Sequence, residues 1–457
     1  MLAGRRLRPR RGPGTAVNRS SLVAATLIIG LALPASAPAA AVVPPAVDAG
    51  LLPRPAPPAP VEPTEQRQPC YQSPTGATGT AHNALNLDTV WPLTRGDGQK
   101  IAVIDTGVAR HRLLPRLIGG GDYVSHGDGT ADCDGHGTIV AGIAAAAPSG
   151  GFSGVAPDAA VLAIRQSSNK FAAAGGVSGV GNVDTLAMAV RTAADLGATV
   201  INISSVACVP ADAAPDDRTL GAALSYAVDV RNVVVVVAAG NVGAGCTQQD
   251  RPVGPPGEPD WNGVRSVSSP GWYDDLVLCV GSVGSDGAAS DFSLAGPWVD
   301  VAAPGEHLVS LHPDGGQLID TIGRDAPISG TSYAAPVVAG VAALVRSRFP
   351  QLSAREVMRR IENTAHTPAD GWNPDVGHGV VDALAAVSGS TPSPRSPSTA
   401  QVSAGPSVAN SADPLPRRIA FGGAAVCVAL TIVTAVTLAA NRLRRRGADA
   451  GDHVARD

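Results

Sequence analysis

Three polar residues of this chain could act together in nucleophilic catalysis: Asp105, His136 and Ser332. Asp105 follows an apolar run, and a carboxylate there is commonly only a turn or capping residue. His136 stands between two glycines, so other groups can approach its ring closely. Ser332 stands where a helix is expected to begin, and serine at such a place is usually a cap. Each residue alone is weak evidence, whereas a serine, a base and an orienting carboxylate together predict acyl transfer.

The roles expected of these residues follow from their chemistry. A serine hydroxyl is a poor nucleophile until a base removes its proton, and His136 can do this near neutral pH and then protonate a leaving amine. Asp105 would hold the imidazole in the correct tautomer and stabilise the imidazolium while remaining ionised. The sequence therefore predicts Ser332 as nucleophile, His136 as general base and Asp105 as its orienting group.

The elements that must position these residues are apolar runs alternating with alanine-rich stretches. The runs lack polar alternation, which predicts parallel strands covered on both faces; they span 99–104, 161–164, 199–203, 232–237, 277–283 and 298–301. Helices are expected over 184–196, 220–230 and 334–349. The alternation predicts one α/β domain, a doubly wound and mostly parallel sheet with helices on both faces. Its site should lie beyond the carboxyl ends of the strands, and the stretches 167–181 and 243–270 should shape the cleft.

Composition marks the segments outside this domain. Arginines, an apolar run and small residues follow one another in 1–37, as in a signal peptide. A proline-rich extension is expected over 38–80, the catalytic domain over 81–387 and a Ser/Pro-rich linker over 388–418. Residues 419–440 contain no charge and are long enough for a transmembrane helix. Arginines after this span predict a cytoplasmic tail at 441–457 and a catalytic domain outside the cell membrane.

Charge and composition exclude several classes of protein. Hydrophobic residues make up 44% and charged residues 16%, which excludes a coiled coil or a charged disordered chain. A net charge of −4 gives no reason to expect a nucleic-acid partner. Acidic and histidine residues crowd one short loop and could be metal ligands, namely Asp122, His126, Asp128, Asp132, Asp134 and His136. Their spacing matches no common metal motif, and we expect neither a metal nor a cofactor.

Four motifs in chain order resemble those of the subtilisin-like serine proteases. Three carry the residues above, and they read Asp105-Thr106-Gly107, His136-Gly137-Thr138 and Gly330-Thr331-Ser332-Tyr333-Ala334-Ala335-Pro336. The fourth, Val237-Ala238-Ala239-Gly240-Asn241, resembles the segment whose asparagine contributes to the oxyanion hole. The resemblance extends from about residue 81 to 387 and implies that the Asn241 amide and the Ser332 backbone N–H stabilise the oxyanion. It also implies that a peptide substrate lies extended beside two segments, Ser204-Ser205-Val206 and Ala238-Ala239-Gly240.

Cysteine usage is consistent with export. Cys427 lies in the expected span and Cys279 in an apolar strand, so four cysteines remain, and these permit three pairings. Cys208 and Cys246 follow segments that should end at the same edge of the sheet, which favours their pairing. Cys70 would then pair with Cys133 and attach the proline-rich extension beside His136.

The arrangement outside the catalytic domain is similar to that of the mycosins, membrane-anchored subtilisin-like proteases associated with type VII secretion in actinobacteria. Many secreted subtilisins carry a compact inhibitory pro-domain, but the short proline-rich stretch before Cys70 cannot fold as one. In mycosins this extension wraps around the catalytic domain without blocking it. The resemblance implies an active, membrane-tethered serine endopeptidase acting on protein or peptide substrates. The alternative is a structural subunit that stabilises the secretion complex, with proteolysis dispensable.

Overall fold

The computed structural model describes residues 42–72, 85–177, 179–213, 215–243, 245–249, 257–323 and 326–389. The expected signal segment 1–37, the span 419–440 and the tail 441–457 lie outside these residues, as does nearly all of the linker 388–418. Within the described residues, no helix is both long and apolar enough to cross a membrane.

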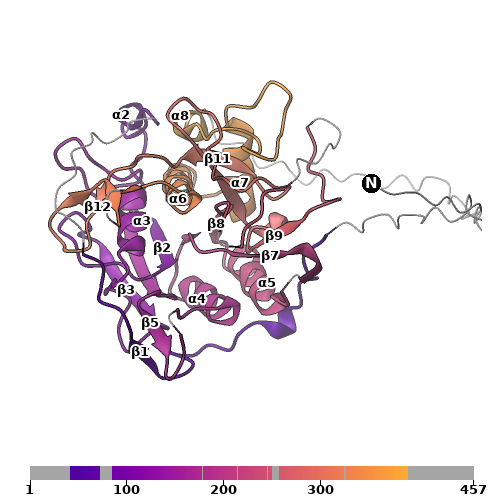
Figure 1. The fold of residues 1–457 in the computed structure, drawn as a ribbon. Helices are drawn as coiled ribbons and strands as arrows, with labels where there is room; N and C mark the ends of the chain where they lie inside the picture. The colour runs from indigo at the N-terminus through magenta and orange to yellow at the C-terminus, as the bar shows by residue number, and fades with distance from the viewer. Residues whose placement is uncertain are drawn as a thin grey trace, which may run out of the picture. The chain divides into compact units, whose positions relative to one another are not determined.

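A seven-stranded parallel sheet forms the centre of the domain, in the order β11-β10-β8-β6-β2-β4-β3 (Figure 1). Its strands are β2 (Lys100–Asp105), β3 (Leu117–Asp122), β4 (Ala160–Arg165), β6 (Val200–Ile203), β8 (Val234–Ala238), β10 (Leu278–Val283) and β11 (Val301–Pro304). The central strands are buried at nearly every position, because helices cover both faces. The expected parallel α/β sheet is therefore present.

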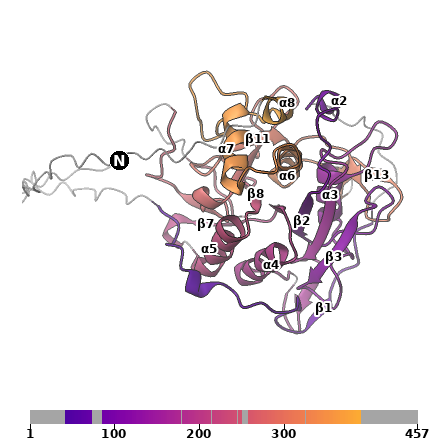
Figure 2. The same ribbon diagram turned by 180° about the vertical axis from the view of Figure 1, so that it is seen from behind.

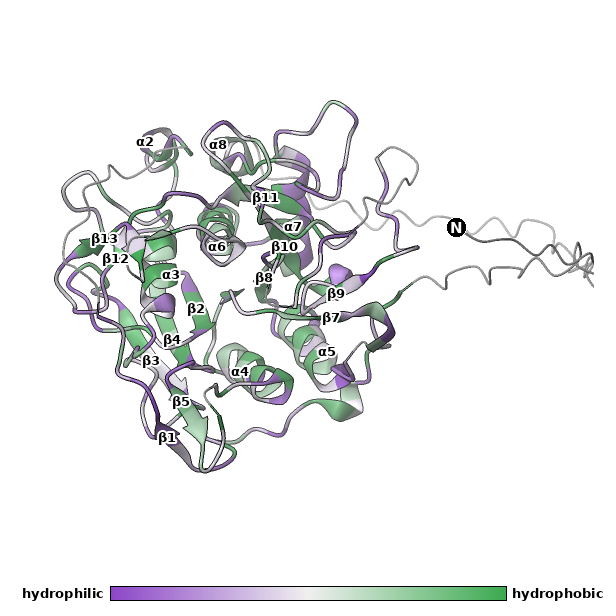
Figure 3. Ribbon diagram, in the orientation of Figure 1, coloured by the Kyte–Doolittle hydropathy of each residue, from purple (hydrophilic) through white to green (hydrophobic). Residues whose placement is uncertain are grey.

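Helices cover the two faces of the sheet in two pairs (Figures 1 and 2). On one face α3 (His136–Ala145) packs against α6 (Thr331–Arg348), and on the other α4 (Val183–Asp195) packs against α5 (Arg218–Ser225). In Figure 3, α3 and α6 are hydrophobic on almost all sides, whereas α4 and α5 also present hydrophilic sides. The other α-helices among the described residues are α2 (Leu87–Val90), α7 (Ala354–Thr364) and α8 (Ala383–Val387).

Three details differ from the pattern read in the sequence. Strand β3 is not predicted because glycines occupy its centre; there, a Cβ on Gly120 would lie 2.9 Å from the carbonyl oxygen of Ala163 on β4. Strand β11 begins at Val301, where the expected run ends. The helix expected over 220–230 is α-helical only to Ser225 and continues as one π-helical stretch, Tyr226–Val230.

Short elements connect and surround these layers. Antiparallel pairs are formed by β7 (Ala207–Pro210) with β9 (Ser266–Ser269), β12 (Ser310–Leu311) with β13 (Leu318–Ile319), and β14 (Thr321–Ile322) with β15 (Ala326–Pro327). The 3₁₀ turns of the described chain span Ala49–Leu51, Ala211–Ala213 and Asp274–Leu276.

Residues 42–72, called the arm below, pack along the outside of this domain. The arm runs past α5 and α4 to β1 (Thr64–Gln66), which pairs antiparallel with β5 (Phe171–Ala173) (Figure 1). A disulfide then joins Cys70 to Cys133. The arm, which is the described part of the expected extension, thus has no core of its own and is held by the catalytic domain.

Candidate active site

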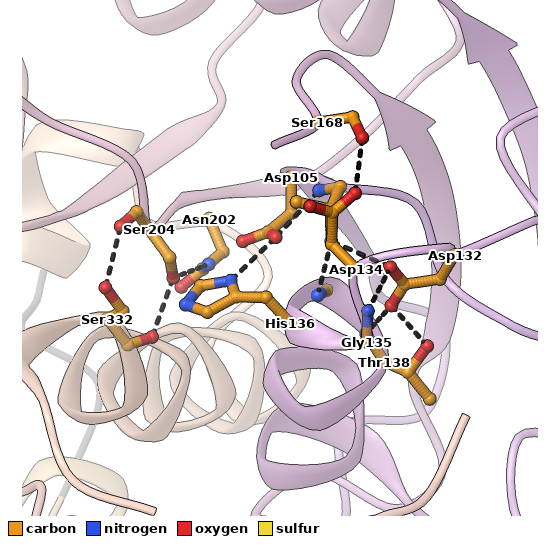
Figure 4. Close-up of polar contacts among 12 residues, drawn as sticks. Asp105, Asp132, Asp134, Gly135, His136, Thr138, Ser168, Asn202, Ser204 and Ser332 are labelled. Atoms are coloured by element: carbon orange, nitrogen blue, oxygen red, sulfur yellow. Dashed lines mark hydrogen bonds and ion pairs between the residues drawn. The ribbon is translucent and has the colours of Figure 1, made fainter. Parts of the chain in front are cut away.

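Asp105 and His136 are brought together by the ends of two elements. Asp105 is the last residue of β2, and His136 is the first residue of α3. The Nδ1–H of His136 donates to Asp105 Oδ1 at 2.7 Å (Figure 4). Asp105 Oδ1 also accepts the backbone N–H of Thr106 at 2.7 Å, and the side chain is only 2% exposed. The buried carboxylate can therefore hold the imidazole in one orientation.

Ser332 lies near this pair but is held by another residue. It is the second residue of α6, whose N-cap is Gly330, so Ser332 is not the helix cap. Its hydroxyl donates to the carbonyl oxygen of Ser204 at 2.9 Å, and the Ser204 hydroxyl donates to the Ser332 carbonyl at 2.8 Å (Figure 4). Catalytic hydrogen bonds are often unformed without substrate. A Ser332 hydroxyl that donates to the imidazole of His136 would first have to rotate away from Ser204.

Asp132 links the two loops that carry Asp105 and His136. Its Oδ1 accepts from the Thr106 hydroxyl and from the Gly135 N–H, each at 2.8 Å. Its Oδ2 accepts from the N–H and the hydroxyl of Thr138, at 2.8 and 2.6 Å. These donors belong to the strand end after β2 and to the first turn of α3, which has no side-chain cap. The sequence suggested Asp132 only as a possible metal ligand; its position four residues before His136 was the available signal.

Surrounding carboxylates raise the pKa of His136 above the usual 6.5 of histidine. Burial acts in the opposite direction, but the charge and hydrogen bond of Asp105, together with the charges of Asp132 and Asp134, outweigh it. Burial also raises the pKa of Asp132, with its hydrogen bonds opposing this and the Asp105 charge adding to it. The surroundings of His136 therefore favour the protonated, positively charged form of its ring.

Asn241 is oriented by Thr331, which the sequence did not single out. Asn241 Oδ1 accepts from the N–H and the hydroxyl of Thr331 at 3.0 and 3.1 Å. This fixes the amide so that its Nδ2 group is directed away from Thr331, and no described residue accepts a hydrogen bond from it. The Ser332 N–H, in the first turn of α6, also lacks an intrahelical acceptor. Two donors are thus available beside the Ser332 hydroxyl.

The two segments expected to pair with a peptide differ in whether their backbone groups already form hydrogen bonds within the domain. Residues 204–206 lie between the end of β6 at Ile203 and the start of β7 at Ala207, outside both ladders. By contrast, the N–H of Ala239 donates to Val280 O, and Gly240 N–H donates to the Thr331 hydroxyl. The backbone of 238–240 is therefore used within the domain, and this segment can line the cleft but not pair with a substrate strand through these groups.

Two cavities mark the cleft around these segments. One, of about 350 Å³ and called the cleft cavity below, is lined by Tyr71, Asp105, Thr106, Asp134, His136, Ser167, Asn169, Lys170, Ser204 and Ser205. The other, of about 150 Å³, lies between Ser167, Gly181 and α4 on one side and Ser205–Ala207 and Ser269 on the other. Residues of the stretch 167–181 line both cavities, whereas Ser269 is the one residue of 243–270 that lines the second.

The cysteines pair as expected, Cys70 with Cys133 and Cys208 with Cys246. Cys279 is buried and free. Two other carboxylates of the acidic loop serve its backbone: Asp122 accepts from the N–H groups of Val124 and Ser125, and Asp128 from that of Thr130. These contacts explain the acidic loop as a set of turns.

Comparisons with known proteins identify the family of this chain. Residues 96–379 match the model of the subtilase family of peptidases. The chain is 55% identical over 440 residues to Mycosin-4 of Mycobacterium tuberculosis, covering 90% of this chain and 94% of that one. The solved MycP3 protease of the type VII (ESX-3) secretion system is 46% identical, with a TM-score of 0.72 over 76% of this chain and all of that one. A chain of the intact ESX-5 inner membrane complex is 40% identical, with a TM-score of 0.72 over 88% of this chain and all of that one.

Proposed function

Because this chain belongs to the mycosin group of the subtilase family of serine proteases, we propose that Asp105, His136 and Ser332 form its catalytic triad. The hydrogen bond between Asp105 and His136 carries this proposal most directly. A carboxylate, an imidazole and a helix-start serine from three distant parts of the chain converge at one edge of the sheet (Figure 4). The chemistry is hydrolysis of peptide bonds through an acyl-enzyme.

The proposed mechanism has two stages, acylation of Ser332 and hydrolysis of the acyl-enzyme. A bound peptide lies along 204–206, and the Ser332 hydroxyl turns to His136 and transfers its proton as the oxygen attacks the carbonyl. The Asn241 amide and the Ser332 N–H donate to the developing oxyanion. His136 then protonates the leaving amine, and water, activated by the same imidazole, hydrolyses the acyl-enzyme. Asp105 stays ionised and stabilises each imidazolium.

Covalent labelling tests the triad. A fluorophosphonate should label the full chain at one site, and Ser332→Ala should abolish labelling without changing the thermal unfolding temperature. Ser204→Ala is the matched control, because it removes a neighbouring hydroxyl that also contacts α6 but is not the nucleophile. Absence of labelling in folded wild-type protein would refute the proposed activity.

We further propose that the protease acts outside the membrane, anchored by 419–440 with its tail in the cytoplasm. The supporting observations are the uncharged span, the arginine-rich residues after it and the likeness to a chain of the periplasmic assembly of the ESX-5 inner membrane complex. Truncation after residue 388 should release labelled enzyme from membranes into the soluble fraction. Retention of the truncated protein in the membrane fraction would contradict this anchor.

A structural role in a type VII secretion complex is the second candidate, and likeness to a chain of the ESX-5 inner membrane complex favours it. On this proposal the domain stabilises the complex, and proteolysis is dispensable. Complementation of a deletion strain with Ser332→Ala separates the two. Full secretion supports the structural role, and loss of secretion with the complex intact supports the catalytic one.

A further inference from the structure

We propose that Lys170 is a specificity-determining residue, which binds a carboxylate on the second substrate residue before the scissile bond. The inference rests on the proposed function and adds a substrate preference to it. The residue lies on the wall of the cleft cavity, which also contains Asp105, His136 and Ser204.

The arm holds this wall in place. Strand β1 pairs with β5, which begins directly after Lys170. The N–H groups of Arg67 and Gln68 donate to the carbonyl oxygen of Lys170 at 2.8 and 3.2 Å. Lys170 Nζ donates to Gln68 Oε1 at 3.4 Å, and the next arm residues include Cys70, whose disulfide anchors the arm. The lysine is therefore placed at the cavity by the arm rather than by the catalytic sheet.

Among the charged side chains that line the described cavity wall, only Lys170 lacks a close hydrogen-bonding partner for its charged group. Asp105 is bound to His136, and both oxygens of Asp134 accept hydrogen bonds, from the Ser168 hydroxyl and the Asn169 N–H. Lys170 Nζ meets only a neutral amide oxygen at a long distance, and no described carboxylate lies within salt-bridge distance of it. The ammonium group is therefore the charge available to a ligand.

The direction in which an extended peptide crosses the site indicates which substrate residue lies next to Lys170. Side chains alternate between the two sides of an extended chain. If the attacked residue directs its side chain toward 238–240, the preceding residue directs its side chain toward Asp105 and His136, into the cleft cavity. Ser204 and Ser205, which line this cavity, belong to the segment expected to pair with the peptide.

The acidic groups nearby repel an incoming carboxylate, but this repulsion is weaker than the attraction of Lys170. Asp105, Asp132 and Asp134 each accept hydrogen bonds from neighbouring residues, and the cleft is open to solvent, which screens charges. Lys170 can instead form a direct hydrogen-bonded pair. For such a partly exposed pair we expect a preference of about fivefold for Glu over Gln, equal to about 1 kcal/mol.

Profiling of a peptide library tests the inference, because a library samples all cleavage sequences in one experiment. Full-length protein is incubated with a library that contains every residue at each position, and the ratio of Glu to Gln is counted at the second residue before each cut. Wild-type protein should give a ratio near five. Lys170→Met should reduce it to about one, and Lys170→Glu should reverse the preference toward Lys.

The only other lysine provides the matched control. Lys100 begins β2 at the opposite end from Asp105, and its Nζ donates to Leu196 O. Lys100→Met should therefore keep the wild-type ratio. Fluorophosphonate labelling at the wild-type rate verifies that each variant has an intact site. A wild-type ratio of one, or a ratio unchanged in Lys170→Met, overturns the inference alone, whereas an uncut library together with no labelling overturns the proposed function as well.

Discussion

Replacement of Asp132 by asparagine should weaken the domain by breaking a defined set of hydrogen bonds. In the wild-type protein, one carboxylate oxygen accepts from Thr106 and Gly135, and the other accepts twice from Thr138. An amide of the same shape offers one acceptor oxygen and one NH₂ group, which can only donate. If its oxygen keeps Thr106 and Gly135, its NH₂ group faces the N–H of Thr138, which then has no acceptor. The Thr138 hydroxyl can rotate and accept, so one N–H carries the loss.

The cost follows from that single unsatisfied donor. A donor left without a partner in the protein interior costs about 1–3 kcal/mol. At about 2–4 °C per kcal/mol, this lowers the Tm by about 2–12 °C. Calorimetry on the full chain measures the shift, and an unchanged Tm would refute the assignment of these bonds.

The same substitution should shift the pH dependence of the site. The negative charge of Asp132 is one of the charges that, against the effect of burial, raise the pKa of His136. Its removal lowers the pKa of His136, so the unprotonated base persists to lower pH. The acid limb of fluorophosphonate labelling should therefore move to lower pH in Asp132→Asn.

A control separates this charge effect from simple destabilisation. Thr138→Val removes a hydroxyl that donates to Asp132 and accepts from the Ala109 N–H, but it leaves all carboxylates in place. It should lower the Tm without moving the acid limb. An acid limb that moves equally in both variants, or stays in place in Asp132→Asn, would refute the electrostatic role of Asp132.

Three further outcomes are expected. In wild-type protein the midpoint of the acid limb should lie above pH 6.5, because the pKa of His136 is raised and only the unprotonated ring can act as base; a midpoint below 6.5 in a pH series of labelling rates would contradict this. Asn241→Ala should lower kcat by about 10²–10³-fold with little change in KM, because a loss of this size in kcat follows removal of such a donor in a subtilisin. Steady-state kinetics with a peptide chosen from the library measure this, and full activity would contradict the assignment. Replacing both Cys70 and Cys133 by serine opens a loop of 63 residues, which should lower the free energy of unfolding by about 4 kcal/mol in denaturant titrations. An unchanged free energy would show that the arm is held without the disulfide.

The sequence alone was sufficient to predict the parallel sheet, and it nominated the residues that we propose as reactive. Apolar runs without alternation reflect strands buried on both faces, so β2, β6 and β8 were predictable from local composition. Strand β3 was not, because its glycines are suited to close packing against β4, and that contact is remote in sequence.

The tertiary structure decided how the reactive groups are arranged. Local sequence indicates that Ser332 lies at the start of a helix. Only the fold shows that its hydroxyl donates a hydrogen bond to the carbonyl oxygen of Ser204 and that Thr331 orients Asn241. It also decided that the backbone of Ala239 is already paired and that Lys170 is held by the arm. Residue types determine which chemistry is possible, because reactivity belongs to the functional group. Orientation, hydrogen-bond partners and pKa depend on groups far apart in the chain, and these are set only when the chain folds.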